Sequence, residues 1–187
     1  MGNGSRVALA EIKCAARTIG LLLTGRLRLP RALVGRQVAF ADGTTSRVYR
    51  VTTLTRQETH EPVVLVVRFR LRLLGDSRLG HAMFRRESVL NTPLFAGHSG
   101  FRVKLWLTDH DTGFYRGVYQ WDGLRSAEEY ASVIETVLGP FCQPGTIDHV
   151  AISNTRLNDF TSAEWRPIEE TAVPPWSLPR RTGVTTG

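Results

Sequence analysis

The sequence predicts an α+β fold with a ferredoxin-like βαββαβ sheet, and two observations lead to this prediction. Between residues 63 and 153, apolar patterning and turn residues indicate strand, helix, strand, strand, helix and strand, in that order. The hairpin within this segment, residues 101–121, alternates two kinds of side chain with the period of two that is typical of a strand. We therefore expect a four-stranded sheet with two helices on one face and a bare second face.

Residues 1–62 form a basic N-terminal extension, because they hold six of the seven net positive charges of the chain. A helix is expected over residues 5–24, since Ser5 can cap it and Gly25 can end it. Its cationic side either binds an anionic membrane or faces water while the apolar side docks on the protein, and we prefer the second interpretation. Asp42-Gly43 predicts a tight turn, and hence a hairpin over residues 38–55.

Residues 63–74 are expected to form the first strand of the sheet, because their β-branched start disfavours a helix. Arginines occupy one face of this strand and apolar residues the other, namely Arg68, Arg70, Arg72 and Phe69, Leu71, Leu73. The arginines must face water, acidic partners or an anionic ligand, since an unpaired buried charge costs on the order of several kcal/mol. A helix follows over residues 76–91, and Pro93 lies just beyond its end.

The predicted hairpin contains two strands, residues 101–108 and 114–121, which a polar turn joins. Gly117 weakens its strand, so we expect a backbone or a ligand to approach it closely. A second helix over residues 126–138 buries one side, and a closing strand covers residues 146–152. Residues 154–187 form a Pro-rich tail, which Trp165 and Trp176 are expected to anchor.

The helix-free face of the sheet is the expected place for a ligand. If Phe69 and Leu105 pack under the helices, the other face carries cations and one indole, namely Arg68, Arg70, Arg72, Arg102, Lys104 and Trp106. Such a group suits a planar anionic or phenolate ligand, held by charge and by cation–π contacts. The alternative is a half-solvated face whose cations pair with acidic residues. A bare face also needs a cover, and a second copy of the chain is the commonest one.

Several residues of this segment form a pattern that resembles a known family. They are Gly100-Phe101, Lys104, Trp106, Gly117-Val118-Tyr119, Trp121, Ala127 and Tyr130. The pattern is similar to that of the YdhR-like monooxygenase branch of the dimeric α/β-barrel superfamily, and it covers residues 63–153. The resemblance implies two ferredoxin-like sheets paired into a barrel, with a pocket on the bare face of each protomer. That superfamily includes cofactor-independent monooxygenases acting on aromatic polyketides, polyketide cyclases and haem-degrading enzymes.

Three histidines are the candidates for a general base, because histidine titrates near neutral pH. His149 lies on the closing strand, His98 in the Gly-rich loop before the hairpin, and His81 on the first helix. A purely structural role is the alternative for each of them. The candidate substrate-binding residues are strand cations and aromatics, namely Arg70, Arg72, Lys104, Trp106, Tyr119 and Trp121. Core packing is the alternative for the aromatic ones.

The cysteines and motifs argue against several classes of protein. Cys14 and Cys142 form no CxxC pair, so a cytoplasmic location is expected. No apolar run reaches the roughly 18 residues of a membrane-spanning helix. There is no phosphate-binding loop and no GxSxG motif, and Asp109-His110-Asp111 reads as a solvated turn and not as a metal site. We therefore expect no metal and no organic cofactor.

These observations lead to one functional hypothesis and two alternatives. We expect a cytoplasmic, homodimeric, cofactor-independent enzyme of the monooxygenase or cyclase type, acting on an aromatic or polyketide-like small molecule, without a nucleic-acid or membrane partner. The first alternative is a non-catalytic barrel protein that binds haem or another small molecule. The second is a protein that binds RNA or a membrane surface through residues 1–62.

Overall fold

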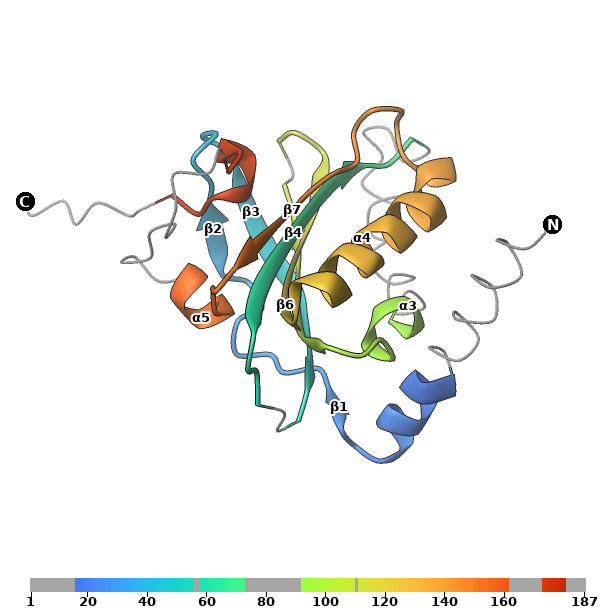
Figure 1. The fold of residues 1–187 in the computed structure, drawn as a ribbon. Coiled ribbons are helices and arrows are strands. Elements are labelled where there is room, and N and C mark those ends of the chain that lie inside the picture. The colour runs from blue at the N-terminus through green and yellow to red at the C-terminus, as the bar shows by residue number, and fades with distance from the viewer. Residues whose placement is uncertain (1–15, 56–57, 73–91, 110, 162–172, 181–187) are drawn as a thin grey trace, which may run out of the picture.

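A computed structural model describes residues 16–55, 58–72, 92–109, 111–161 and 173–180 of the chain. Its centre is one antiparallel sheet of seven strands in the order β1-β3-β5-β6-β4-β7, with β2 paired to β3 beside this path (Figure 1). The strands are β1 Leu27–Arg28, β2 Gln37–Ala39, β3 Thr45–Leu54, β4 Pro62–Arg70, β5 Phe101–Thr108, β6 Phe114–Asp122 and β7 Asp148–Ser153. The helices and 3-10 turns include α3 Pro93–Ala96, α4 Leu124–Leu138, η1 Gly139–Phe141, α5 Leu157–Phe160 and η2 Pro175–Ser177. Residues 16–23, within the helix predicted over residues 5–24, are helical as well.

Four consecutive strands of this sheet, β5-β6-β4-β7, are the four that the sequence predicts, and their order is that of a ferredoxin-like sheet. The predicted second helix is α4, and it buries one side, as expected, through Ala127, Tyr130, Ala131, Ile134 and Leu138. The helix predicted over residues 76–91 lies outside the described residues. The mixed α+β class and the antiparallel sheet are therefore confirmed.

The N-terminal hairpin adds strands to the same sheet. Asp42 accepts a hydrogen bond from the Thr44 backbone N–H at 3.0 Å, and Gly43 takes a φ of 86° in the turn, as the Asp-Gly pair predicts. The second strand of the hairpin, β3, pairs antiparallel with β5 along six residue pairs. Residues 45–54 therefore belong to the same sheet as the predicted ferredoxin-like strands and lie directly beside β5.

A β-bulge in β5 reverses the expected faces of that strand. The pairing with β6 moves from Phe101 opposite Trp121 to Val103 opposite Gln120, so Arg102 is an extra residue. As a result, Lys104 and Trp106 lie on the side that α4 covers. The prediction that Lys104 and Trp106 share a face with Arg70 is therefore wrong, because one inserted residue exchanges the two faces of a strand.

The helix-covered side of the sheet holds the larger apolar core. Residues Val63, Leu65, Val67 and Phe69 alternate along β4 and pack there against α4. Arg68 and Arg70, the intervening residues at the end of β4, point to the opposite side. Figure 1 shows α4 lying across one side of the sheet while α5 lies on the other.

The tail of the chain packs on the side opposite α4. Leu157 and Phe160 of α5 and Trp176 of η2 are buried there, together with Phe40 from the end of β2. Trp165, the other tryptophan of the predicted tail, lies outside the described residues, so the anchoring of the tail stays a prediction. The expectation that this face is left bare is wrong for the part covered by these residues, and the homodimeric barrel stays a prediction. Among the described residues, no helix is long and apolar enough to cross a membrane.

Candidate functional site

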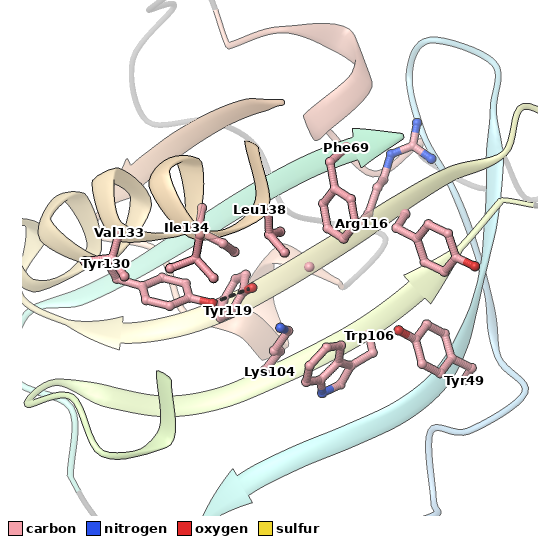
Figure 2. A pocket seen from close by; sticks show the side chains of 13 residues that line it. Tyr49, Phe69, Lys104, Trp106, Arg116, Tyr119, Tyr130, Val133, Ile134 and Leu138 are labelled. Atoms are coloured by element: carbon pink, nitrogen blue, oxygen red, sulfur yellow. Dashed lines mark hydrogen bonds between the residues drawn. The ribbon is translucent and has the colours of Figure 1, made fainter. Parts of the chain in front are cut away.

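A narrow cavity lies between α4 and the sheet, on the helix-covered side (Figure 2). Its volume is about 30 Å³, which exceeds the roughly 10–15 Å³ that one water molecule needs. Aromatic side chains from four strands and α4 line it, namely Tyr49, Phe69, Trp106, Tyr115, Tyr119 and Tyr130. Val133, Ile134 and Leu138 of α4 close the helix side. The one charged group that points into this space in Figure 2 is the amine of Lys104.

Lys104 is a buried lysine enclosed by aromatic rings. Its side chain is part of a residue only 5% exposed, and its Nζ lies 3.2 Å from the ring centroid of Trp106. The ring centroids of Phe95 and Tyr119 lie 4.4 and 4.7 Å from the same nitrogen. None of the ion pairs among the described residues involves Lys104. The amine therefore meets π-electrons where a structural lysine normally meets a carboxylate.

The charge state of Lys104 depends on two opposing effects. Burial lowers the pKa of Lys104 well below its usual value, and the nearby guanidinium of Arg50 lowers it further. Cation–π contacts favour the ammonium form, but they are worth about 0.5–2 kcal/mol, whereas desolvating a charge costs on the order of several kcal/mol. Desolvation is therefore the larger effect. It favours a neutral amine, which can accept a proton or attack an electrophile.

A pair of tyrosine hydroxyls supplies the second polar element of the cavity. The hydroxyls of Tyr119 on β6 and Tyr130 on α4 lie 3.0 Å apart and share a buried hydrogen bond. Burial raises the pKa of Tyr119 well above its usual value, and the neighbouring Tyr130 adds to this rise. Tyr119 consequently stays a phenol at neutral pH, so it can donate a proton or a hydrogen bond to an oxygen of a bound molecule.

Gly117 explains how Tyr119 reaches this position. A Cβ atom at Gly117 would lie 2.6 Å from Cε2 and 2.8 Å from the hydroxyl oxygen of Tyr119. The close neighbour expected at this glycine is therefore the ring of Tyr119, two residues further along the same strand. A side chain at position 117 would push that ring out of its place between Gly117 and Tyr130.

The strand β3 contributes residues to the site that the sequence did not connect with it. Trp106 donates its indole Nε1–H to Thr52 Oγ1 at 3.0 Å, which fixes the plane of the indole. Tyr49 lines the cavity, and the guanidinium of Arg50 lies 5.5 Å from the Trp106 ring centroid. Sequence reasoning missed these residues because the alternation of side chains within β3 does not show that this strand pairs with β5.

The predicted substrate-binding residues separate into two groups. Lys104, Trp106 and Tyr119 line the cavity. Trp121 is fully buried with its ring centroid 5.0 Å from that of Tyr130, in the core beside the cavity. Arg70 is exposed on the opposite side of the sheet. The exposed Arg72 donates from Nη2 to the carbonyl oxygen of Pro140 at 2.8 Å. The structure therefore does not bring Arg70 and Arg72 to the cavity.

The histidines lie away from the cavity lining. His149 is exposed on β7, with Nδ1 3.0 Å from Glu135 Oε1 of α4. The half-buried ring of His98 packs 5.9 Å from Tyr130 and 6.4 Å from Trp121, measured between centroids. His81 lies outside the described residues. Within the part of the chain that the structure describes, no three His, Cys, Asp or Glu residues gather into a possible metal site.

A second hollow of about 160 Å³ lies on the other side of the sheet, beside β2 and η2. Its lining combines aliphatic residues with Arg36 and Arg180, and it contains neither an aromatic ring nor a buried ionisable group. The cavity next to Lys104 is therefore the better candidate site, because it combines aromatic walls with a perturbed ionisable group.

Comparisons with known proteins gave structural neighbours but no sequence family. No family model matches the chain, and no curated protein gives a significant match. A haem-degrading enzyme from Listeria monocytogenes superposes with a TM-score of 0.43 at 12% identity, covering 58% of this chain and 70% of that one.

A ferredoxin-fold protein related to antibiotic biosynthesis monooxygenases, also from Listeria monocytogenes, gives a TM-score of 0.35 at 14% identity. A monooxygenase-like protein from Listeria innocua gives a TM-score of 0.38 at 16% sequence identity. In both cases the match covers 58% of this chain and 63% of the other, so this chain spans less than two thirds of either neighbour.

Proposed function

We propose that this chain is a cofactor-independent tailoring enzyme, of the monooxygenase or cyclase type, that acts on an aromatic or polyketide-like molecule in the cavity beside Lys104. One observation carries the proposal: a buried lysine without an acidic partner among the described residues projects into a cavity walled by aromatic rings. Aromatic walls favour a planar ligand through stacking, and their side chains must move apart to admit one, because the closed cavity of about 30 Å³ holds only about two water molecules. A neutral amine at their centre suits a ligand with an acidic proton.

The first chemical step is the removal of that proton. The Lys104 amine accepts a proton from a phenol or from a methylene group next to a carbonyl, and becomes an ammonium ion beside the new anion. The cation–π contacts with Trp106 and the charge of the anion both stabilise this ammonium ion. Tyr119 donates a hydrogen bond to the oxygen on which the negative charge is concentrated.

The same anion leads to either of the two reaction types. In a monooxygenase reaction the anion gives electrons to dioxygen, one oxygen atom becomes the ketone oxygen of the product, and the other leaves as water. In a cyclase reaction the carbon atom of the anion attacks a carbonyl group of the same molecule and forms a ring. Both routes need proton removal and water exclusion, which the cavity can supply, and neither requires a resident cofactor.

Binding of a phenolic probe tests the ligand part of this proposal. Titration with 2-naphthol, followed by tryptophan fluorescence, should saturate and should give a Kd about tenfold or more below that for naphthalene, since only 2-naphthol has an acidic proton. Lys104→Met should remove most of this difference. Arg70→Ala is the matched control on the opposite side of the sheet and should leave both constants unchanged. Absence of saturable binding for both probes would contradict the proposal.

Oxygen consumption tests the reaction. With anthrone, which has an acidic methylene group, the protein should accelerate oxygen uptake, and Lys104→Met should lower the rate by about 10²–10⁴-fold, the usual contribution of a general base. If Lys104→Met leaves oxygen uptake unchanged, Lys104 is not the base. If 2-naphthol binds but no oxygen is consumed, a cyclase or a binding role is favoured over a monooxygenase.

A further inference from the structure

We propose that the Lys104 amine also reacts covalently with aldehydes and ketones, forming an imine inside the cavity. This inference rests on the proposed function only in placing the ligand in the same cavity, since base catalysis and imine formation are different reactions. It assigns a second substrate class to the site, namely small or planar carbonyl compounds.

The choice of lysine at this position is the first support. Of the 24 basic residues of the chain, only Lys13 and Lys104 are lysines, and all others are arginines. Arginine stays protonated at any pH that a protein experiences, whereas lysine can become a neutral nucleophile. The buried cavity therefore holds one of the two side chains, among the Lys and Arg residues of the sequence, that are able to lose their charge.

The groups around the amine are the second support. They come from every described element that packs against it: Tyr49 and Arg50 on β3, Tyr119 on β6, Tyr130 on α4 and Phe95 on α3. The charged group in this set is the cation of Arg50, which disfavours a second positive charge nearby. Arg116 of β6 also lines the cavity, but its guanidinium points away from Lys104 in Figure 2. No carboxylate is among them, so within the described part of the chain no negative charge next to the amine opposes the effect of burial.

The reaction itself is balanced with the groups present. The nitrogen lone pair of Lys104 attacks the carbonyl carbon, a C–N bond forms, and one N–H proton passes to the carbonyl oxygen to give a neutral carbinolamine. The hydrogen-bonded hydroxyls of Tyr119 and Tyr130 are placed to donate a proton to this oxygen, which then leaves as water. Transfer of the remaining N–H proton back to the tyrosine oxygen gives the neutral imine and restores the phenol. No electrons are gained or lost in this sequence, so it needs no oxidant.

Reductive trapping on the full chain tests the inference, with acetaldehyde as the small probe and benzaldehyde as the planar one. Sodium cyanoborohydride reduces each imine to a stable secondary amine, and peptide mass spectrometry then compares modification of Lys104 with that of Lys13 in the same sample. At pH 7, Lys104 should react about tenfold or more faster with at least one probe. This preference should disappear as the pH approaches the ordinary lysine pKa of about 10.4.

Two variants separate a reactive site from mere accessibility. Tyr119→Phe should slow trapping at Lys104 and leave Lys13 unaffected, because it removes the proton donor for water release. Lys104→Arg should abolish labelling in the cavity. In the unchanged protein, 2-naphthol at saturating concentration should reduce the labelling of Lys104. Lys13 labelled with Lys104 unlabelled would overturn the inference.

The two proposals fail in distinguishable ways. If 2-naphthol binds in a Lys104-dependent manner and no imine is trapped, the proposed function stands and the imine is wrong. If the imine is trapped and 2-naphthol does not bind, the covalent site stands and the phenolic ligand class is wrong.

Discussion

Lys104 and Arg116 are buried basic side chains on neighbouring strands of one sheet, but they lie on opposite sides of it and have opposite surroundings. Arg116 on β6 is 2% exposed, donates to Ser46 Oγ at 2.6 Å and to Thr44 Oγ1 at 2.7 Å, and lies 3.3 Å from Asp42. Its Nη1 also lies 3.7 Å from Asp109 Oδ2. Lys104 has aromatic rings where Arg116 has carboxylates and hydroxyls.

The difference separates a basic side chain with a structural role, Arg116, from one that is available for chemistry, Lys104. Asp42, Thr44 and Ser46 belong to the N-terminal hairpin, so Arg116 joins this hairpin to the centre of the sheet. Figure 2 shows its guanidinium pointing away from Lys104 and the cavity. A paired, hydrogen-bonded cation keeps its charge and is unavailable to a ligand, whereas an enclosed amine without an acid is free to exchange its proton.

The largest expected effect is that of removing the paired cation. Arg116→Met leaves the buried carboxylate of Asp109 and the partly buried one of Asp42 without their partner, so the free energy of unfolding should fall by about 3–5 kcal/mol. Urea unfolding followed by circular dichroism measures this loss, and Arg70→Met, a change at an exposed arginine, should cost less than about 0.5 kcal/mol. A loss below about 1 kcal/mol for Arg116→Met would remove the structural role.

Replacing Lys104 should change the free energy of unfolding in the opposite direction. Lys104→Met takes a desolvated polar group out of an apolar site, so the free energy of unfolding at pH 7 should rise by about 1–3 kcal/mol. Because the folded-state pKa of Lys104 is lowered, the unfolded chain binds more protons between that pKa and about 10.4.

Wild-type stability should therefore increase relative to the variant through this window, and the gap should close near pH 10. Urea unfolding of both proteins at pH 7 and pH 10 measures the trend. A Lys104→Met variant that is less stable than wild type at both pH values would contradict the assignment of an unpaired amine.

A third variant tests the shape of the cavity without touching its charge. Gly117→Ala places a methyl group against the Tyr119 ring, so it should weaken 2-naphthol binding and cost about 1–3 kcal/mol of stability through overpacking. Gly139→Ala is the matched control, because nothing lies within 4 Å of a Cβ atom there and its backbone is helical. Equal behaviour of the two variants would show that the Tyr119 position does not matter.

The smallest effect is expected for an exposed cation. Arg125 and Glu129 form an i,i+4 ion pair at 2.8 Å on the outer side of α4, with both side chains largely in water. Arg125→Gln should change stability by no more than about 0.3–0.5 kcal/mol, and added salt should abolish the difference. A larger, salt-independent loss would show that the contribution of these basic side chains to stability does not follow their exposure to water.

Local patterns in the sequence predicted the strands, the hairpin turn at Asp42-Gly43 and the buried side of α4, because these features depend on residues that are close together in the chain. It assigned Lys104 and Trp106 to the wrong side of the sheet, since the bulge at Arg102 changes the period at one residue only. Apolar residues also occupy both sides of β4 and β5, because the tail and the hairpin cover the side expected to be bare. Pattern alone does not tell which of two apolar sides faces the helices.

Local sequence did not single out Lys104 as a candidate base for a related reason. An ordinary lysine pKa near 10.4 makes histidine the natural first choice at neutral pH. Burial lowers the pKa of Lys104 from that value, and the charge of Arg50 lowers it further. The rings that enclose the amine, Phe95, Trp106 and Tyr119, come from separate segments that the fold brings together. Burial of this kind depends on tertiary contacts that local sequence does not contain.

Direct titration of the two lysines tests the central claim, that Lys104 is held as a neutral amine. Lysine-specific isotope labelling gives two side-chain signals in the full chain, and Lys13→Arg identifies the one that belongs to Lys104. Their chemical shifts, followed against pH by NMR, should show Lys104 releasing its proton well below Lys13. Two signals that titrate together near the ordinary value of about 10.4 would contradict the account.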